Sequence, residues 1–171
     1  MSLTPKFKAA RKVLNGLSPS ERAALEIICA EIRAAEEKLL EAGRVVCENG
    51  LCGAKGLCCR NVNLDEIINL QDFVFILVSD PSLGEAISGR LVNEGLFVAN
   101  CLFLENGAGP CIFPRASRPE TCITAFCGDD RPVRGELVEV RVGFERLSRF
   151  LAKRRLLRFG SALGRAWGRS W

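Results

Sequence analysis

Residues 18–43 read SPSERAALEIICAEIRAAEEKLLEAG, and this stretch decides the class of fold. Ser18 is a typical helix N-cap, Pro19 suits the first helical position, and Glu21 completes a capping box. Gly43 is a typical helix end. The pattern therefore predicts an amphipathic helix over residues 19–42. Its apolar stripe recurs at alternating spacings of three and four residues, at Leu25, Ile28, Ile32, Ala35 and Leu39.

Two further helices are predicted downstream of this one. Residues 63–66 form a second capping arrangement, and the helix that they open ends at Asp80-Pro81. Its apolar run at residues 73–78 also fits a buried strand, so both alternatives stay open there. A short helix is expected within residues 82–94.

The rest of the chain predicts one hairpin, a helical turn and a last helix. Residues 97–104 and 110–113 flank Asn106-Gly107, which predicts a turn between two short strands. A helical turn is expected within residues 117–127. The last helix is expected from about Gly135 to Phe159, with an apolar stripe on one face and basic residues on the other.

The predicted fold is mainly α with a small β-hairpin and irregular cysteine-rich loops. A length of 171 residues fits one compact domain. The domain divides into an N-terminal helical segment (1–44), a cysteine-cluster region (45–130) and a basic C-terminal helix and tail (131–171). Charge is uneven, because residues 131–171 carry a net charge of +8 and residues 1–130 a net charge of −4.

The composition contains nine cysteines but neither histidine nor tyrosine. The lack of histidine excludes mixed cysteine–histidine zinc sites, Ser-His and Cys-His catalytic pairs and histidine proton shuttles. No secretory signal opens the chain, and no apolar run approaches the roughly 20 residues of a membrane span. We therefore expect a cytoplasmic protein that is not transmembrane, in which clustered cysteines hold metal more often than they form disulfides.

The cysteines fall into two blocks and one separate residue. Cys29 lies beside the stripe of the first helix and is expected to be a small buried hydrophobe. Glycines alternate with cysteines in residues 45–62, which predicts a tight irregular loop with backbone N–H groups turned toward sulfur. The other eight cysteines are the predicted metal ligands: Cys47, Cys52, Cys58, Cys59, Cys101, Cys111, Cys122 and Cys127.

The spacing of these cysteines bears on the kind of metal. The chain has no Cys-x-x-Cys pair, the usual half of a four-cysteine zinc site. Adjacent side chains diverge in extended and in helical chain, so Cys58 and Cys59 are expected to reach two metals or two irons of one cluster. Scattered buried cysteines and disulfides are the alternatives to metal. The spacing favours a polynuclear centre or two neighbouring sites, and the cofactor is either an iron–sulfur cluster, 4Fe-4S, or zinc.

The ordered cysteines also resemble a known family. With Leu64-Asp65-Glu66-Ile67 after the first block and Arg118-Pro119-Glu120-Thr121-Cys122 in the second, residues 45–130 resemble the YkgJ-like cysteine-cluster family. Its members are described as zinc- or iron-chelating domains, so the resemblance implies metal chelation, with an iron–sulfur cluster in some relatives. The chain departs from the family pattern at Phe113, where tyrosine is usual, and at Ile123, where arginine is common.

The function that we predict is a metal-binding cysteine-cluster protein with an iron–sulfur centre for electron transfer or a metal-dependent reaction. Arg118 is expected either to pair with the charge of the cluster, as the predicted cofactor-binding residue, or to pair with a nearby carboxylate. Glu66 is interpreted as a capping residue rather than a catalytic acid. Whether the chain is an enzyme stays open. An enzyme that acts through a reactive thiol is the least favoured alternative, because no histidine is present to activate a thiol.

The C-terminal segment predicts the class of partner. Gly160 and Gly164 are expected to loosen the chain after the last helix. Beyond an unknown redox or protein partner, the segment suits an anionic partner, either nucleic acid or a membrane surface, or is a solvated helix face. A structural zinc module that binds a partner or nucleic acid through this helix is the alternative function. Charge and aromatic rings alternate at its end: Arg165, Trp167, Arg169 and Trp171.

Overall fold

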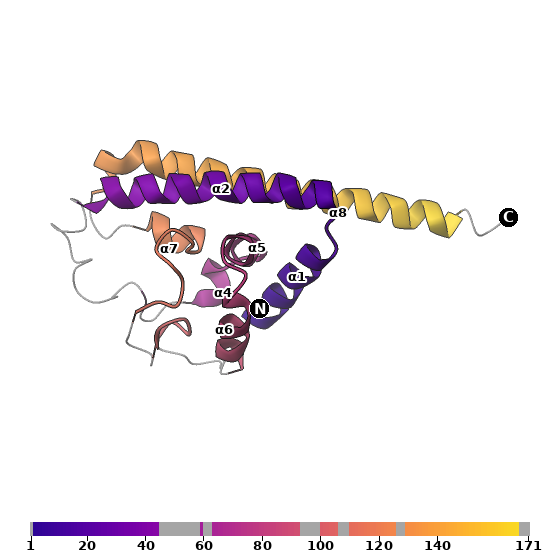
Figure 1. The fold of residues 1–171 in the computed structure, drawn as a ribbon, viewed down its shortest axis with the longest axis horizontal. Coiled ribbons are helices and arrows are strands. Elements are labelled where there is room, and N and C mark those ends of the chain that lie inside the picture. Colours follow the sequence, from indigo (N-terminus) through magenta and orange to yellow (C-terminus); the bar gives the residue numbers. More distant parts are fainter. Residues whose placement is uncertain are drawn as a thin grey trace.

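A computed structural model of the chain describes residues 2–44, 59, 63–92, 100–105, 110–125 and 129–167, with side chains as far as residue 157. This part is mainly helical (Figure 1). None of its helices has the length and apolar character that crossing a membrane requires. The helices are α1 (Leu3–Asn15), α2 (Pro19–Ala42), α4 (Leu64–Ile67), α5 (Leu70–Ser79), α6 (Leu83–Leu91), α7 (Glu120–Thr124) and α8 (Arg134–Trp167), with a 3-10 turn, η4 (Arg131–Val133), before α8.

The helix predicted from residues 18–43 is confirmed with its bounds. The Ser18 hydroxyl accepts a hydrogen bond from the Glu21 amide at 3.2 Å, and the Glu21 carboxylate accepts one from the Ser18 amide at 2.7 Å. At the other end the Gly43 amide donates to the Leu39 carbonyl at 2.7 Å. Cys29 is buried in this helix, as expected, and burial raises the pKa of its thiol to about 12.

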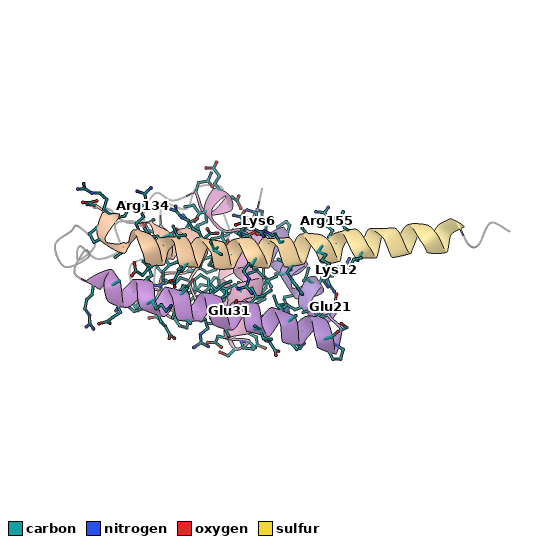
Figure 2. All side chains as sticks on the ribbon, turned by 90° about the horizontal axis from the view of Figure 1, so that it is seen from above. Lys6, Lys12, Glu21, Glu31, Arg134 and Arg155 are labelled. Carbon is teal, nitrogen blue, oxygen red and sulfur yellow. The ribbon has the colours of Figure 1, made fainter. Side chains whose placement is uncertain are left out.

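The two longest helices, α2 and α8, lie side by side, with the shorter helices on one side of the pair (Figures 1 and 2). They run antiparallel, because the N-terminal half of α2 pairs with the later turns of α8. Three ion pairs show this antiparallel alignment of the two helices: Lys38–Glu139, Glu31–Arg146 and Glu21–Arg154. The pair forms the long axis on which the rest of the described chain is packed.

Gly143 allows a close approach of these two helices. A Cβ atom at this position would lie 2.7 Å from Cγ1 of Ile32 on α2, which is closer than carbon atoms pack. The absence of a side chain is therefore what lets the backbones meet at this crossing. Ile32 of α2 is fully buried at this contact with α8.

The core is centred on α5, whose residues 72–77 are all buried. A helix that is apolar on every side is expected in the interior, and α5 packs against α1, α2, α6 and α8. Aromatic rings join it to its neighbours edge to face, Phe7 to Phe73 at 5.4 Å and Phe144 to Phe75 at 5.2 Å. The apolar run at residues 73–78 is therefore helix and not strand.

The predicted helix over residues 63–80 is interrupted. Ile68 is extended, with φ −97° and ψ 123°, so α4 ends and α5 begins again at its own cap. The ammonium group of Lys6 in α1 donates to the carbonyls of Asp65 and Ile68, the second at 2.8 Å. These donations satisfy carbonyls at the end of α4 that a continuous helix would have paired within itself. The short helix expected after residue 82 is confirmed as α6.

The predicted hairpin is not confirmed. The described residues contain no strand, and Leu104 and Cys111 form an isolated antiparallel bridge instead. Two backbone bonds flank this bridge: the Glu105 amide donates to Pro110 at 3.0 Å, and the Ile112 amide donates to Phe103 at 2.9 Å. The two segments are thus antiparallel neighbours, while the turn at Asn106-Gly107 lies outside the described residues. The helical turn expected after Pro119 is confirmed as α7.

The last helix is longer than predicted. The expectation that Gly160 and Gly164 loosen the chain is wrong, because α8 continues through both to Trp167. One glycine costs a helix interior only about 1 kcal/mol, and the residues between these glycines are mostly good helix formers. As a result the end of α8 projects past the other helices (Figure 1).

Candidate metal centre

Half of the predicted ligands lie in the part of the chain that the structure describes. They come from both sequence blocks, since Cys59 belongs to the first block and Cys101, Cys111 and Cys122 belong to the second. The other predicted ligands, Cys47, Cys52, Cys58 and Cys127, lie outside the described residues.

A backbone hydrogen bond joins the two blocks. The Cys101 amide donates to the Cys59 carbonyl at 2.8 Å. Cys101 is buried and Cys59 is half-buried, so the contact lies at the margin of the core. The Cys101 carbonyl in turn accepts from the Leu104 amide at 3.1 Å, which closes a tight turn after the cysteine. Residues more than forty positions apart are thereby held in contact.

Aromatic packing fixes the next cysteine to the same region. Cys111 pairs with Leu104 in the antiparallel bridge, and the Leu104 carbonyl accepts a bond from the Arg90 guanidinium at 2.9 Å. The ring of Phe103 lies 4.7 Å from that of Phe113 and 6.5 Å from that of Phe73 in α5. Phe113, two positions after Cys111, is thus a buried apolar ring with no hydroxyl to donate or accept.

Cys122 is carried by α7, a helix of five residues. The start of this helix is held by Asp72 of α5, whose carboxylate accepts from the Glu120 amide at 2.8 Å and from the Asn69 amide at 2.7 Å. The Cys122 amide donates to the Pro119 carbonyl at 2.9 Å. One buried carboxylate therefore connects the central helix to the helix that positions Cys122.

Three described cysteines act electrostatically on the thiol of Cys122. Desolvation by the surrounding protein, and then the thiols of Cys101 and Cys111, with smaller effects of Asp72 and Cys59, raise the pKa of the Cys122 thiol. This holds although part of the Cys122 side chain is exposed to solvent. Across the described ranges, no three cysteine or carboxylate side chains are arranged to hold one metal ion. Cys59 of the first block is next to Cys101 of the second, and half of the predicted ligands lie outside the described residues.

Three carboxyl groups behind Cys122 were missed by the sequence analysis. They come from three helices: Glu36 from α2, Asp72 from α5 and Glu120 from α7. Burial raises the pKa of Glu36 to about 8 and that of Asp72 to about 6, and it also raises the pKa of Glu120. Glu36 and Asp72 are almost fully inaccessible to solvent. Carboxyl groups whose pKa values are raised by burial therefore lie next to the cysteine-bearing helix.

Glu36 faces Arg118, the predicted cofactor-binding residue. Neither carboxylate oxygen of Glu36 has a hydrogen-bond partner among the described residues, and the same is true of Nε of Arg118. The backbone N–H and the guanidinium of Arg118 lie near enough to lower the pKa of Glu36, against the larger effect of burial, without meeting hydrogen-bond geometry. Of the two roles expected for Arg118, proximity to a carboxylate is observed, and pairing with a cluster stays a prediction.

The sequence does contain a signal for the buried acids. Glu36 lies on the apolar side of α2, four residues after Ile32 and three before Leu39, where a solvent-facing charge is out of place. Asp72 is the third residue of a helix that is otherwise apolar on every side. Charged residues inside an apolar pattern are candidates for function because burying them unpaired is costly.

The arrangement can hold and release protons beside a group of thiols. A metal centre bound by thiolates is anionic, and negative charge nearby raises the pKa of carboxyl groups further. Searches with the chain return no matching protein-family model, no matching curated protein and no matching solved structure.

Proposed function

We propose that the chain is a metal-binding protein of the YkgJ-like cysteine-cluster kind, in which the two cysteine blocks hold an iron–sulfur centre. A 4Fe-4S cluster suits thiolate ligands, and it would serve electron transfer or a metal-dependent reaction. The eight cysteines of the two blocks are the proposed ligands, with Arg118 as a second contact to the cluster. A reducing compartment such as the cytoplasm would keep these thiols available.

The observation that carries the proposal is the hydrogen bond from the Cys101 amide to the Cys59 carbonyl. It brings a cysteine of the glycine-rich first block next to the second block, as a shared centre requires. The influence of Cys101, Cys111 and Cys59 on the Cys122 thiol supports the same grouping. Thiols this close repel one another once they are deprotonated, and a bound cation offsets that repulsion.

The test is to purify the full chain without oxygen and to record its visible spectrum and its iron, sulfide and zinc contents. Brown colour with iron and sulfide in equal amounts is the expected result. A colourless protein that holds zinc in a fixed ratio would overturn the iron–sulfur assignment and establish the zinc alternative. A protein that binds neither metal would overturn both.

Single substitutions then locate the ligands. Cys59→Ser, Cys101→Ser and Cys122→Ser should each lower the metal content, because each removes a thiolate from the proposed set. The matched control is Cys29→Ala, which removes a buried cysteine of α2 outside the two blocks. Equal metal loss in the control would show that the losses follow from unfolding and not from ligand removal. Cys58→Ser and Cys59→Ser should have different effects if these two neighbours reach different metal atoms.

A further inference from the structure

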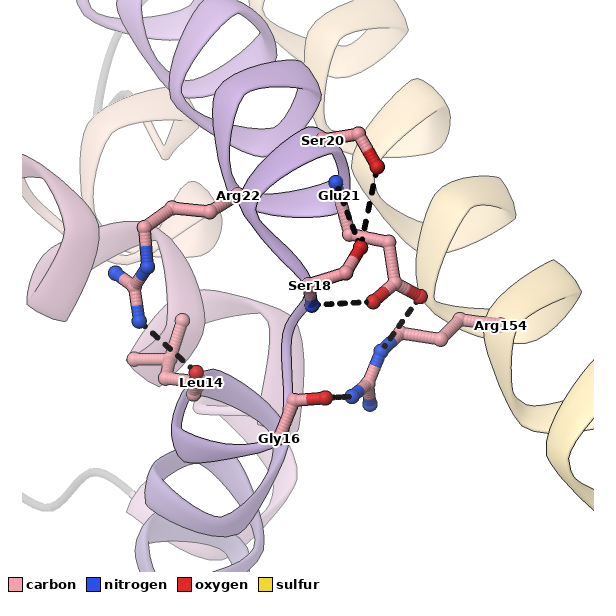
Figure 3. Close-up of polar contacts among 7 residues, drawn as sticks. All are labelled: Leu14, Gly16, Ser18, Ser20, Glu21, Arg22 and Arg154. Carbon is pink, nitrogen blue, oxygen red and sulfur yellow. Dashed lines mark hydrogen bonds and ion pairs between the residues drawn. The ribbon is translucent and has the colours of Figure 1, made fainter.

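The end of α8 leaves the body of the protein at a defined residue, Arg154. This arginine is buried, its Nε lies 3.2 Å from the Glu21 carboxylate, and its guanidinium donates to the Gly16 carbonyl at 2.5 Å (Figure 3). It therefore ties α8 to the corner between α1 and α2. The next two described leucines, Leu156 and Leu157, are 72% and 65% exposed. The helix thus changes from packed to solvent-exposed within one turn.

The apolar side of α8 changes at the same place. Within the body the buried stripe is formed by Val140, Phe144 and Leu147, and the next positions in that register are residues 151, 154, 158, 161 and 165. After Leu151 these positions are three arginines and one serine, so the stripe that faces the core does not continue as an apolar one. A new apolar stripe begins on the opposite side of the helix, at the helical spacing of Leu156, Phe159, Leu163 and Trp167.

Charge divides the projecting segment in the same way. No acidic residue follows Glu145 in the chain. Three arginines over the body are paired, since Arg146 contacts Glu31, Arg149 contacts Glu145 and Arg154 contacts Glu21. The projecting end contains basic residues and no acidic residue in its sequence, among them Lys153, Arg158 and Arg165. The segment is therefore a short amphipathic helix with an apolar side and a cationic side.

We propose that the projecting end of α8 binds the surface of an anionic lipid bilayer, independently of the metal centre. A cationic helix with a separate apolar stripe is suited to lie in the plane of such a surface, with its apolar side among the acyl chains and its arginines at the headgroups. Nucleic acid would be bound by the arginines alone and gives no reason for exposed leucines. A second copy of the helix would face the same positive charge.

The chain carries its own reporter for this contact. Its two tryptophans, at positions 167 and 171, are both at this end, and it has no tyrosine. Intrinsic fluorescence therefore comes from the proposed binding segment alone. Titration of the full chain with vesicles of phosphatidylcholine and phosphatidylglycerol should shift the emission to the blue. Vesicles of phosphatidylcholine alone should shift it little, and added salt should weaken the response because the attraction is partly electrostatic.

Substitution of two leucines of the new apolar stripe separates insertion from charge attraction. The double change Leu156→Gln with Leu163→Gln keeps good helix formers and the full charge, and should weaken vesicle binding about tenfold or more. The matched control is Val138→Gln with Val142→Gln, which removes two exposed apolar residues from the part of α8 that lies over the body. This control should bind vesicles within about twofold of the unchanged chain.

Three results would overturn the proposal: no binding of the full chain to anionic vesicles, equal binding by the leucine variant, or tight binding to RNA or duplex DNA with none to vesicles. The last result would establish a nucleic-acid contact instead. All proposed metal ligands are unchanged in these variants, so their metal content should equal that of the unchanged chain. A failure of the iron–sulfur assignment would therefore leave the vesicle result intact.

Discussion

The pairing of α2 with α8 differs from the cysteine-bearing side of the protein in how each is held together. Between the long helices, apolar side chains fill the interior and the polar contacts are ion pairs at the margin. On the cysteine-bearing side, short segments are joined by single backbone bonds, and Glu36 and Arg118 keep buried polar atoms without a hydrogen-bond partner. We infer that folding stability and the chemistry of the candidate site depend on different regions of this fold, so a mutation should be able to change one without the other.

The strongest test of that separation is Phe144→Ala in α8. This side chain is fully buried and packs edge to face on Phe75, so its removal should lower the free energy of unfolding by about 3–5 kcal/mol. Urea unfolding followed by circular dichroism measures the change. The control is Val142→Ala on the exposed side of the same helix, which should change stability by less than about 0.5 kcal/mol. A small effect of Phe144→Ala would place the main source of stability outside the helix pair.

Glu36→Gln tests the unpaired acid on the other side. A carboxyl whose pKa rises to about 8 on folding binds its proton more tightly in the folded state. Its contribution to stability is therefore complete below about pH 4.5 and is lost as the pH rises through 8. Between pH 5 and pH 8 the free energy of unfolding of the unchanged chain should fall by about 3 kcal/mol more than that of the glutamine variant. If the free energy of unfolding depended on pH in the same way in both proteins, Glu36 would already be charged, and hence paired, in the folded state.

Asp72→Asn tests the connection between the two regions. An asparagine keeps the shape but offers one carbonyl oxygen to two backbone donors, the amides of Asn69 and Glu120. One buried N–H would lose its partner, at a cost of about 1–3 kcal/mol. Hydrogen exchange at the amides of α7 should accelerate more than exchange in α8. Uniform acceleration across both helices would contradict a local role in holding Cys122.

Lys38→Ala should have the smallest effect. Its ammonium group lies 3.0 Å from the Glu139 carboxylate, but both side chains are more than half exposed. An exposed ion pair contributes about 0–1 kcal/mol, and the loss should disappear at high salt. The measurement is the urea midpoint at low and high salt, and a large salt-independent loss would assign a greater share of stability to the ion pairs.

The sequence predicted the helical elements well because local patterns determine them. The cap at Ser18, the end at Gly43 and the stripe between them needed no distant contact, and the bounds of α2 were confirmed. The break at Ile68 could not be read in the same way, because the Lys6 side chain that satisfies the freed carbonyls comes from α1, about sixty positions earlier. The continuation of α8 beyond Gly160 was missed because glycine weakens a helix without ending it.

The cysteines of the candidate site were named from the sequence as metal ligands, which stays a prediction, and their surroundings were not predicted. Spacing and the absence of histidine singled out the eight cysteines, and four of them are seen as one neighbourhood from two blocks. Asp72 was not singled out, because its role depends on a bond to Glu120 across 48 positions. Arg118 was expected to pair with a cluster or with a nearby carboxylate, and the proximity of Glu36 depends on how α2 is placed, which no local pattern indicates.

The close approach of α8 to α2 at Gly143 also affects the direction in which the projecting end of α8 points. The contact with Ile32 fixes the line of α8 along α2, and Arg154 holds the helix to that line where it leaves the body. Thirteen residues then separate Arg154 from Trp167, so the end of α8 extends roughly 20 Å beyond its last contact with the corner between α1 and α2. A methyl group added at Gly143 would push α8 away from α2 and so change the direction in which the projecting end points.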